Sequence, residues 1–428
     1  MQFIGGKYMI LKGNIIFTST PEKFDTYPNS YILVIDGKVK SITDEIPKGY
    51  TQKDVKDFGD ALIIPGFVDV HVHGPQFYNS GIGYSKELIP WLNEYTFPLE
   101  SKFKDIDFAK KAYEEFVNEL CKVGTTRACV MATIHKDATN ILIELFEKSG
   151  LGAYIGKVNM DRNSPDYLIE NTKDSIKDTE DLILELEAKN NKEQLKPLVN
   201  YIVSPRFVPS TTAELMKNLG NLSEKYNLPI QSHLDENRDE IAWVESLHPE
   251  VNSFCEVYEH YGLLRNNQTI MAHCIYNKPE EIELLKKYNI MVAHCAQSNF
   301  NLSSGIMPLR YYLNENISVG IGSDVGAGHT LDMRKHIIST ITASKMYWVN
   351  NPKYLPLSIS EAYYLATKGG GSFFGKVGSF ETDYEFDALI VKDEPTPEEF
   401  SLEERLERFI YRGDSNWIKR RYVRGNEY

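Results

Sequence analysis

Two histidines, His71 and His73, end an apolar run with one residue between them. In a β-strand this spacing sends both side chains to the same face, where two imidazoles can share one metal ion. Three more residues end later β-rich runs in the same way: His233, His273 and Asp324. Imidazoles combined with a carboxylate suit zinc, and a catalytic zinc keeps one position open for water. The pattern predicts metal-dependent hydrolysis, because a bound metal ion lowers the pKa of water toward about 7.

A hydrolase of this kind also needs a group that carries protons. Glu236 follows His233 by three residues in SHLDENRDE, close enough to the strand end to enter the same pocket. A carboxylate beside a metal ion can move protons between water, substrate and leaving group. The alternative interpretation is that Glu236 is an acidic residue at the start of a helix, where the helix macrodipole favours negative charge.

The elements that must position these residues follow a repeated pattern. Eight β-rich runs alternate with amphipathic stretches such as DFAKKAYEEFVNELCKVG, which is typical of βα units. The runs are LIIPGFVDVHVH, TTRACVM, GAYIGKVNM, NYIVSPRF, PIQSHLDE, TIMAHCIY, IMVAHCAQSN and SVGIGSDVGA. We expect an α/β fold with a TIM-type (β/α)8 barrel over residues 67–375, in which the carboxyl ends of the strands meet on one face. An open eight-stranded sheet is the alternative layout.

The two ends of the chain predict a second, smaller domain. KYMILKGNIIFT and YILVIDGKVKSIT alternate as strands do, and the Asp36-Gly37 dipeptide is a strong hairpin signal. EFDALIVKDE, near the other end, is a further strand candidate. Because the ends of a domain usually lie close together at its surface, we expect residues 1–66 and 376–428 to form one small β-sandwich-like domain.

The composition narrows the class of partner. The chain has 428 residues, with 47 Lys and Arg against 60 Asp and Glu, and its net charge is −13. The electrostatic field of this negative charge repels nucleic acid and anionic membranes, and we expect neither as a partner.

Lys7 and Lys12 break the apolar amino-terminal stretch and no cleavage site follows it, so we expect no signal peptide and a cytoplasmic location. Five cysteines without a C-x-x-C pair predict reduced thiols.

Longer motifs add a resemblance to a known family. PGFVDVHVHGPQF, SPRF, SHLDENRDE, MAHC, HCAQSNFNLSSG and GIGSDVGAGHT occur in this order between about residues 61 and 375. In order and spacing they resemble the amidohydrolase superfamily, and the combination of GPQF, SPRF and SHLDENRDE is similar to its members that deaminate guanine. The resemblance implies hydrolysis of guanine to xanthine and ammonia, a reaction of purine catabolism, by a homodimeric enzyme.

The resemblance also implies a role for each candidate residue. One zinc ion, or ferrous iron, would be held by His71, His73, His233 and Asp324. Glu236, His273 and Asp324 would be catalytic, with Glu236 moving protons and His273 contacting the water that the metal activates. The fourth β-rich run, NYIVSPRF, has no lysine of the kind that bridges two metal ions in some relatives, which predicts one metal ion per chain.

The purine would be held by Gln76, Arg206, Phe207 and His233. The residue types agree with this, because Arg206 supplies donors for a carbonyl oxygen, Gln76 offers a donor and an acceptor, and Phe207 can stack on a flat ring. Ala296 departs from the family pattern, since many relatives have proline there, and only local loop rigidity depends on it. Two alternatives stay open: an amidohydrolase acting on another aminated ring (a pterin, cytosine or a triazine), or a barrel that binds zinc without turnover.

Overall fold

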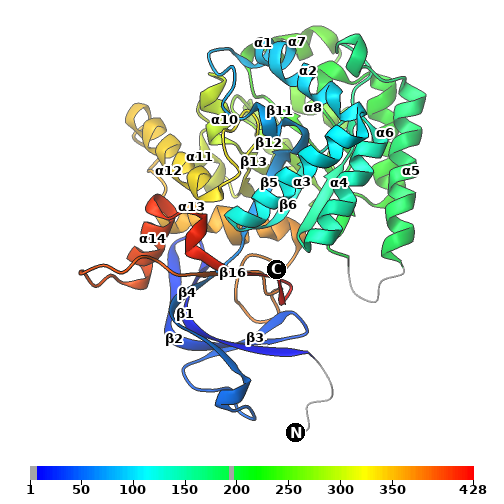
Figure 1. Ribbon diagram of the computed structural model, residues 1–428. Coiled ribbons are helices and arrows are strands. Elements are labelled where there is room, and N and C mark those ends of the chain that lie inside the picture. The colour runs from blue at the N-terminus through cyan, green and yellow to red at the C-terminus, as the bar shows by residue number, and fades with distance from the viewer. Residues whose placement is uncertain (1–6, 192–196) are drawn as a thin grey trace.

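Eight parallel strands form the wall of a barrel in the computed structural model, which describes residues 7–191 and 197–428 (Figure 1). They lie in two four-stranded sheets, ordered β5-β6-β7-β9 and β11-β12-β13-β14. A parallel bridge between Val203 and Ile230 joins the sheets on one side, and β14 contacts β5 on the other. The predicted (β/α)8 barrel is therefore confirmed, and the alternative of an open sheet is excluded.

The barrel strands match the eight predicted runs. Their bounds are β5 (Phe67–His73), β6 (Thr125–Met131), β7 (Gly152–Gly156), β9 (Val199–Tyr201), β11 (Ile230–Leu234), β12 (Thr269–His273), β13 (Met291–His294) and β14 (Val319–Ile321). Two short strands, β8 (Val158–Asn159) and β10 (Ser204–Pro205), pair with each other beyond the ends of β7 and β9.

The first predicted run needs a correction, because it divides between two sheets. Residues 62–65 belong to β4 (Val55–Pro65) of the smaller sheet, and the barrel strand β5 begins only at Phe67. The chain passes from one sheet to the other at Gly66, where a Cβ atom would lie 2.2 Å from Cγ2 of Thr126. Apolar side chains are required on both sides of this crossing, so the hydrophobic pattern continues through it.

Helices follow the barrel strands and cover their outer side (Figure 1). Their bounds are α3 (Ile106–Val123), α4 (Lys136–Ser149), α5 (Thr172–Asn190), α6 (Ala213–Tyr226), α7 (Arg238–Leu247), α8 (Phe254–His260), α9 (Pro279–Lys287), α10 (Ala296–Asn301), α11 (Leu309–Asn314), α12 (Met333–Asn350) and α13 (Ile359–Tyr364). The connection from β5 to α3 is longer and holds the short helices α1 (Leu88–Trp91) and α2 (Phe97–Glu100).

Helix α3 shows how the sequence sets these boundaries. Asp105 accepts hydrogen bonds from the backbone N–H groups of Asp107 and Phe108, which caps the first turn. The helix ends at Gly124, whose φ of 90° lies in the left-handed region that glycine adopts without strain. Between these ends an apolar face that includes Tyr113 and Phe116 is buried in the main hydrophobic core.

Strands from both ends of the chain form the smaller sheet below the barrel (Figure 1). Its order is β17-β16-β15-β4-β1-β2-β3. The bounds are β1 (Tyr8–Thr20), β2 (Lys23–Ile35), β3 (Lys38–Thr43), β15 (Ala388–Val391), β16 (Ile418–Val423) and β17 (Asn426–Glu427), with helix α14 (Leu402–Arg412) between β15 and β16. The described residues of the two terminal segments contribute to one seven-stranded sheet. The domain boundaries at residues 66 and 376 stay a prediction. Asp36 and Gly37 have φ values of 50° and 74°, which confirms the predicted hairpin turn.

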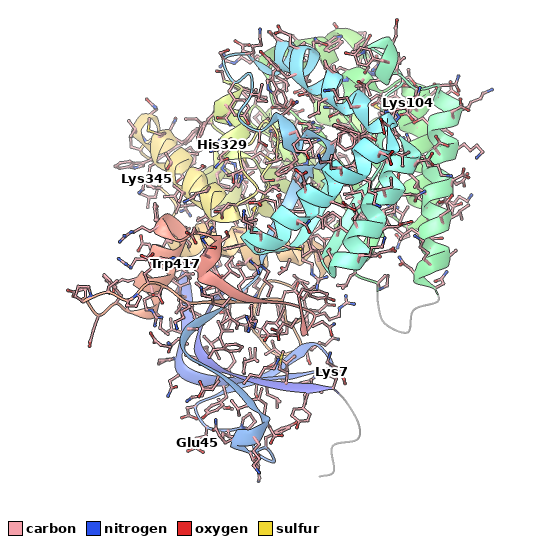
Figure 2. The ribbon with its side chains drawn as sticks, viewed as in Figure 1. Lys7, Glu45, Lys104, His329, Lys345 and Trp417 are labelled. Carbon is pink, nitrogen blue, oxygen red and sulfur yellow. The ribbon has the colours of Figure 1, made fainter. Side chains whose placement is uncertain are left out.

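A buried ion-pair cluster joins the barrel to this sheet. Arg127, on β6, donates to both carboxylate oxygens of Asp387, at 2.6 and 3.0 Å, and to Glu385 at 2.7 Å. Trp417 lies where the barrel and the sheet meet (Figure 2) and stacks on Phe409 of α14.

Within the described residues, no helix is long and apolar enough to cross a membrane. The first six residues of the stretch for which we expect no signal peptide lie outside the described residues.

Candidate active site

The histidines singled out in the sequence meet at the carboxyl ends of the barrel strands. His71 and His73 lie at the end of β5, His233 lies in β11 and His273 is the last residue of β12. Asp324 comes three residues after the end of β14. All five side chains are buried. One potential ligand atom from each of His71, His233, His273 and Asp324 lies within 4.8 Å of the others.

His73 adjoins this group and is a fifth candidate. Its Nε2 lies 3.1 Å from Nε2 of His233 and 3.3 Å from Oδ1 of Asp324. Nε2 of His71 lies at the same distance, 3.3 Å, from the same carboxylate oxygen. His273 is set further away, with its Nε2 3.8 Å from Oδ2 of Asp324. His71 and His73 thus lie equally close to one oxygen of Asp324, His233 adjoins His73, and His273 lies further from that carboxylate.

The hydrogen bonding of these imidazoles fits a metal ion. Nδ1 of His233 lies 2.7 Å from the carbonyl oxygen of Arg206, which can only accept, so this nitrogen carries the proton and Nε2 is free to bind a cation. Among the described residues, both ring nitrogens of His71 and Nε2 of His273 are buried without a well-formed hydrogen bond. Buried polar atoms normally have a partner, and a metal ion would supply one to a ring nitrogen of His71.

The charges of the group suit the same purpose. Burial lowers the pKa of His73 to about 4, and it lowers the pKa of His233 well below the ordinary value, so both imidazoles are neutral ligands at pH 7. Burial alone would raise the pKa of Asp324, but its contacts with the imidazoles of His71 and His73 outweigh burial. The net result is a pKa well below the usual range, so the carboxylate stays ionised.

Backbone geometry and the buried carboxylate of Asp69 fix the positions of these side chains. His273 and Asp324 have φ values of 73° and 48°, in the left-handed region that few non-glycine residues adopt. Oδ1 of Asp69 accepts hydrogen bonds from the backbone N–H groups of His71, at 3.2 Å, and Ser323, at 2.9 Å. Asp69 therefore ties β5 to the loop after β14.

Glu236 lies beside the histidines, in the connection between β11 and α7. Its Oε2 is 3.4 Å from Nε2 of His273, and its Oε1 accepts a hydrogen bond from Ser304. Burial, reinforced by the negative charge of Asp324, raises the pKa of Glu236 well above the ordinary value. Helix α7 begins at Arg238 with Asn237 as its N-cap, so Glu236 precedes the helix and faces the pocket.

A pocket of about 390 Å³, counting its opening to solvent, lies next to this group. Every predicted site residue except His71 lines it, and these include Gln76, Arg206 and Phe207. Apolar side chains of Leu88, Trp91 and Leu92, from the long connection after β5, complete the wall. Such a pocket, apolar with a few convergent polar groups, suits a small flat molecule.

Two buried carboxylates at the pocket were not predicted. Glu240 lines the pocket and accepts hydrogen bonds from the backbone N–H groups of Glu236, at 3.0 Å, and Asn237, at 3.3 Å. The N-x-x-E spacing of Asn237 and Glu240 is a capping-box signal that could have identified it. Glu100, at the end of α2, hydrogen-bonds to both Gln76 and Arg206. The unusual length of the connection that contains Glu100 is the only signal for it, because long connections often carry function.

Comparisons with known proteins show the family to which the chain belongs. The model of the amidohydrolase family matches residues 62–427. Guanine deaminase of Dictyostelium discoideum is 40% identical over 98% of this chain and 97% of its own length, and human guanine deaminase is 36% identical over 86% and 82%. The crystal structure of guanine deaminase from C. acetobutylicum with bound guanine in the active site is 53% identical, covers 98% of this chain and 100% of its own, and superposes with a TM-score of 0.95. The chain therefore belongs to the amidohydrolase family, in the branch that contains the guanine deaminases.

Proposed function

We propose that the protein deaminates guanine hydrolytically, converting guanine and water to xanthine and ammonia. The observation that carries the proposal is the buried group of histidines and Asp324 opening onto a pocket whose walls include Arg206 and Gln76. The likeness to a guanine deaminase solved with guanine in its active site supports the choice of substrate. The reaction is one of purine catabolism.

We assign one metal ion, zinc or ferrous iron, to His71, His73, His233 and Asp324. When bound, the ion supplies the Lewis acidity that makes water a nucleophile near neutral pH. Glu236 takes a proton from the attacking water and delivers it to the ring nitrogen beside C2. The amino group on C2 leaves as ammonia after it receives the second proton of the water, which comes from the hydroxyl now bound to C2, so that this oxygen becomes the carbonyl of xanthine. His273, whose Nε2 lies 3.4 Å from Glu236, contacts the attacking water and orients it toward C2.

The base is held by other residues that line the pocket. Arg206 donates to the carbonyl oxygen of guanine, and Gln76 contacts the adjoining part of the ring. Phe207, buried beside them, packs against the face of the purine. His233, which lines the pocket and whose Nδ1 donates to the carbonyl oxygen of Arg206, contacts the substrate as well. We further propose that the enzyme acts in the cytoplasm as a homodimer.

The test is an assay of purified, metal-loaded protein with guanine, in which xanthine is followed by absorbance and ammonia is measured independently. A panel of adenine, a pterin, cytosine and a triazine is run in parallel. We expect guanine to give the highest kcat/KM by at least about 10²-fold, because a site built around substrate hydrogen bonds rejects analogues that leave them unmade. Faster release of ammonia from another ring would replace guanine as the substrate. No release from any ring would favour a barrel without turnover.

Arg206→Ala should lower kcat/KM on guanine by about 10- to 100-fold, since a hydrogen bond from a charged group contributes about 1.5–3 kcal/mol. The slow rate on adenine should hardly change, because the exocyclic amino group of adenine gives the guanidinium no acceptor. Arg206→Lys is the matched variant, since it keeps a positive charge beside Glu100 while removing the planar fork. An equal fractional loss on the two bases, at constant metal content, would show that Arg206 supports the fold and does not recognise the base.

A further inference from the structure

A buried carboxylate connects the two polar residues of the base-binding wall. Glu100, the last residue of α2, is 2% exposed. Its Oε1 accepts a hydrogen bond of 2.9 Å from Nε2 of Gln76, and its Oε2 accepts one of 2.6 Å from Nη1 of Arg206. The guanidinium also lies 5.1 Å from the centre of the Phe97 ring, three residues earlier in the same helix. One short helix therefore holds both base-binding side chains.

The chemistry of a carboxylate fixes which way the Gln76 amide points. An isolated glutamine can exchange its amide nitrogen and oxygen by rotation and so serve as donor or acceptor. A carboxylate oxygen only accepts, and both oxygens of Glu100 are engaged, one by Gln76 and the other by the guanidinium of Arg206. The nitrogen of Gln76 must therefore face Glu100, and its Oε1 is the atom left to face a ligand in the pocket. Gln76 thus offers the ligand an acceptor.

Arg206 offers the complementary group right beside it. Its guanidinium has only donors, and one of its nitrogens is committed to Glu100. Because Gln76 and Arg206 bind the two oxygens of one carboxylate, the acceptor and the remaining donors lie next to each other on the wall. This pair is complementary to a ring carbonyl beside a ring N–H, as in the lactam edge of guanine. It is not complementary to an unprotonated ring nitrogen at the position of that N–H.

We propose that Glu100 is a positioning residue that selects the lactam edge of the base by fixing the direction of the Gln76 amide. The inference rests on the proposed function, in that the ligand is taken to be a 2-aminopurine ring system. It goes beyond that function by assigning specificity to a residue that does not line the pocket. Glu100→Gln is the informative change, because a neutral amide of the same size can both donate and accept and so allows Gln76 to turn.

The experiment measures binding without turnover, in metal-loaded protein that carries Glu236→Gln. Two ligands are titrated: guanine, by competition, and 2-aminopurine, by its own fluorescence. Both bear the 2-amino group, but 2-aminopurine lacks the carbonyl and presents an unprotonated ring nitrogen where guanine has its N–H. We expect Glu100→Gln to weaken guanine at least tenfold and to change 2-aminopurine less than twofold, so that the preference for guanine falls tenfold or more. An equal loss on both ligands, or no loss on either, would overturn the proposal.

Two further measurements separate positioning from simple destabilisation. In protein that carries Gln76→Leu, the same Glu100→Gln change should no longer alter the preference between the two ligands, because the side chain through which Glu100 acts is missing. Gln76→Leu alone should reproduce most of the lost preference, which keeps the proposal testable even where Glu100→Gln folds poorly. A full tenfold effect of Glu100→Gln in the Gln76→Leu protein would refute action through Gln76. The experiment measures binding and not turnover. A protein that proved inactive on guanine would therefore refute the proposed function without deciding the role of Glu100.

Discussion

Glu236→Gln is expected to lower kcat on guanine by about 10²- to 10⁴-fold while the metal content stays at that of the unchanged protein. General acid–base groups typically contribute this much, and the substitution removes the exchangeable proton while keeping the size of the side chain. The position of Glu236 is the physical reason, because a buried carboxylate beside His273 can take a proton from water and, once protonated, return it to the ring. Stopped assays for xanthine and ammonia, with metal analysis of the same samples, measure both quantities.

The matched control for this change is Asp239→Asn. Asp239 lies three residues away but is exposed, so the variant alters charge by the same amount outside the pocket. Its turnover should stay within about twofold of the unchanged protein. Near-normal turnover of Glu236→Gln with full metal content would mean that another residue carries the proton, and Glu240, which lines the same pocket, would be the next to test.

His71→Asn is expected to remove the metal ion and, with it, all activity above background. His71 is fully buried at the centre of the group, and its nitrogens have no well-formed hydrogen bond within the described part of the chain, so a shorter amide leaves the site one ligand short. Metal analysis of the unchanged protein should give about one ion per chain, and the variant should approach zero. A reproducible value near two, with activity following the second ion, would contradict the assignment of a single metal.

His329→Asn is the control for loss of an imidazole. His329, labelled in Figure 2, lies further along the same loop as Asp324 but is exposed and is not part of the metal group. Its metal content and turnover should match those of the unchanged protein. If His71→Asn kept a full metal ion, His273 would have to be counted among the ligands, because its Nε2 already lies within the same group.

The part of the site that the sequence could predict consists of residues with a distinctive chemistry at strand ends. His71, His233 and Asp324 are separated by much of the chain, yet the (β/α)8 pattern alone brings strand ends to one face. The capping-box residue Glu240 left a signal that could have been used. Glu100 left no signal beyond the length of its connection, because a glutamate in a short helix is usually solvated, and its burial depends on a partner, Arg206, 106 residues further along.

The prediction of the fold succeeded to a similar degree, and it was wrong at one place for a similar reason. The hairpin at Asp36-Gly37 and the alternation of strands and helices are local patterns, and both are seen in the structure. The division of one apolar run at Gly66 depends on which sheet each half joins, and an apolar strand reads the same in either sheet. The connection after β5 is likewise recognisable as unusual from its length, but its length does not predict where the side chains of Trp91 and Glu100 lie.

The order of strands in the smaller sheet sets the order in which the protein can be completed during synthesis. Strand β4 pairs with β1 on one edge and with β15 on the other, and β15 lies near the end of the chain. A ribosome therefore releases every barrel strand before the second edge of β4 can be covered. Until then that edge presents unpaired backbone groups, which are a template for association with other chains. Loss of the last segment of the chain would leave the barrel strands intact in sequence while making this exposed edge permanent.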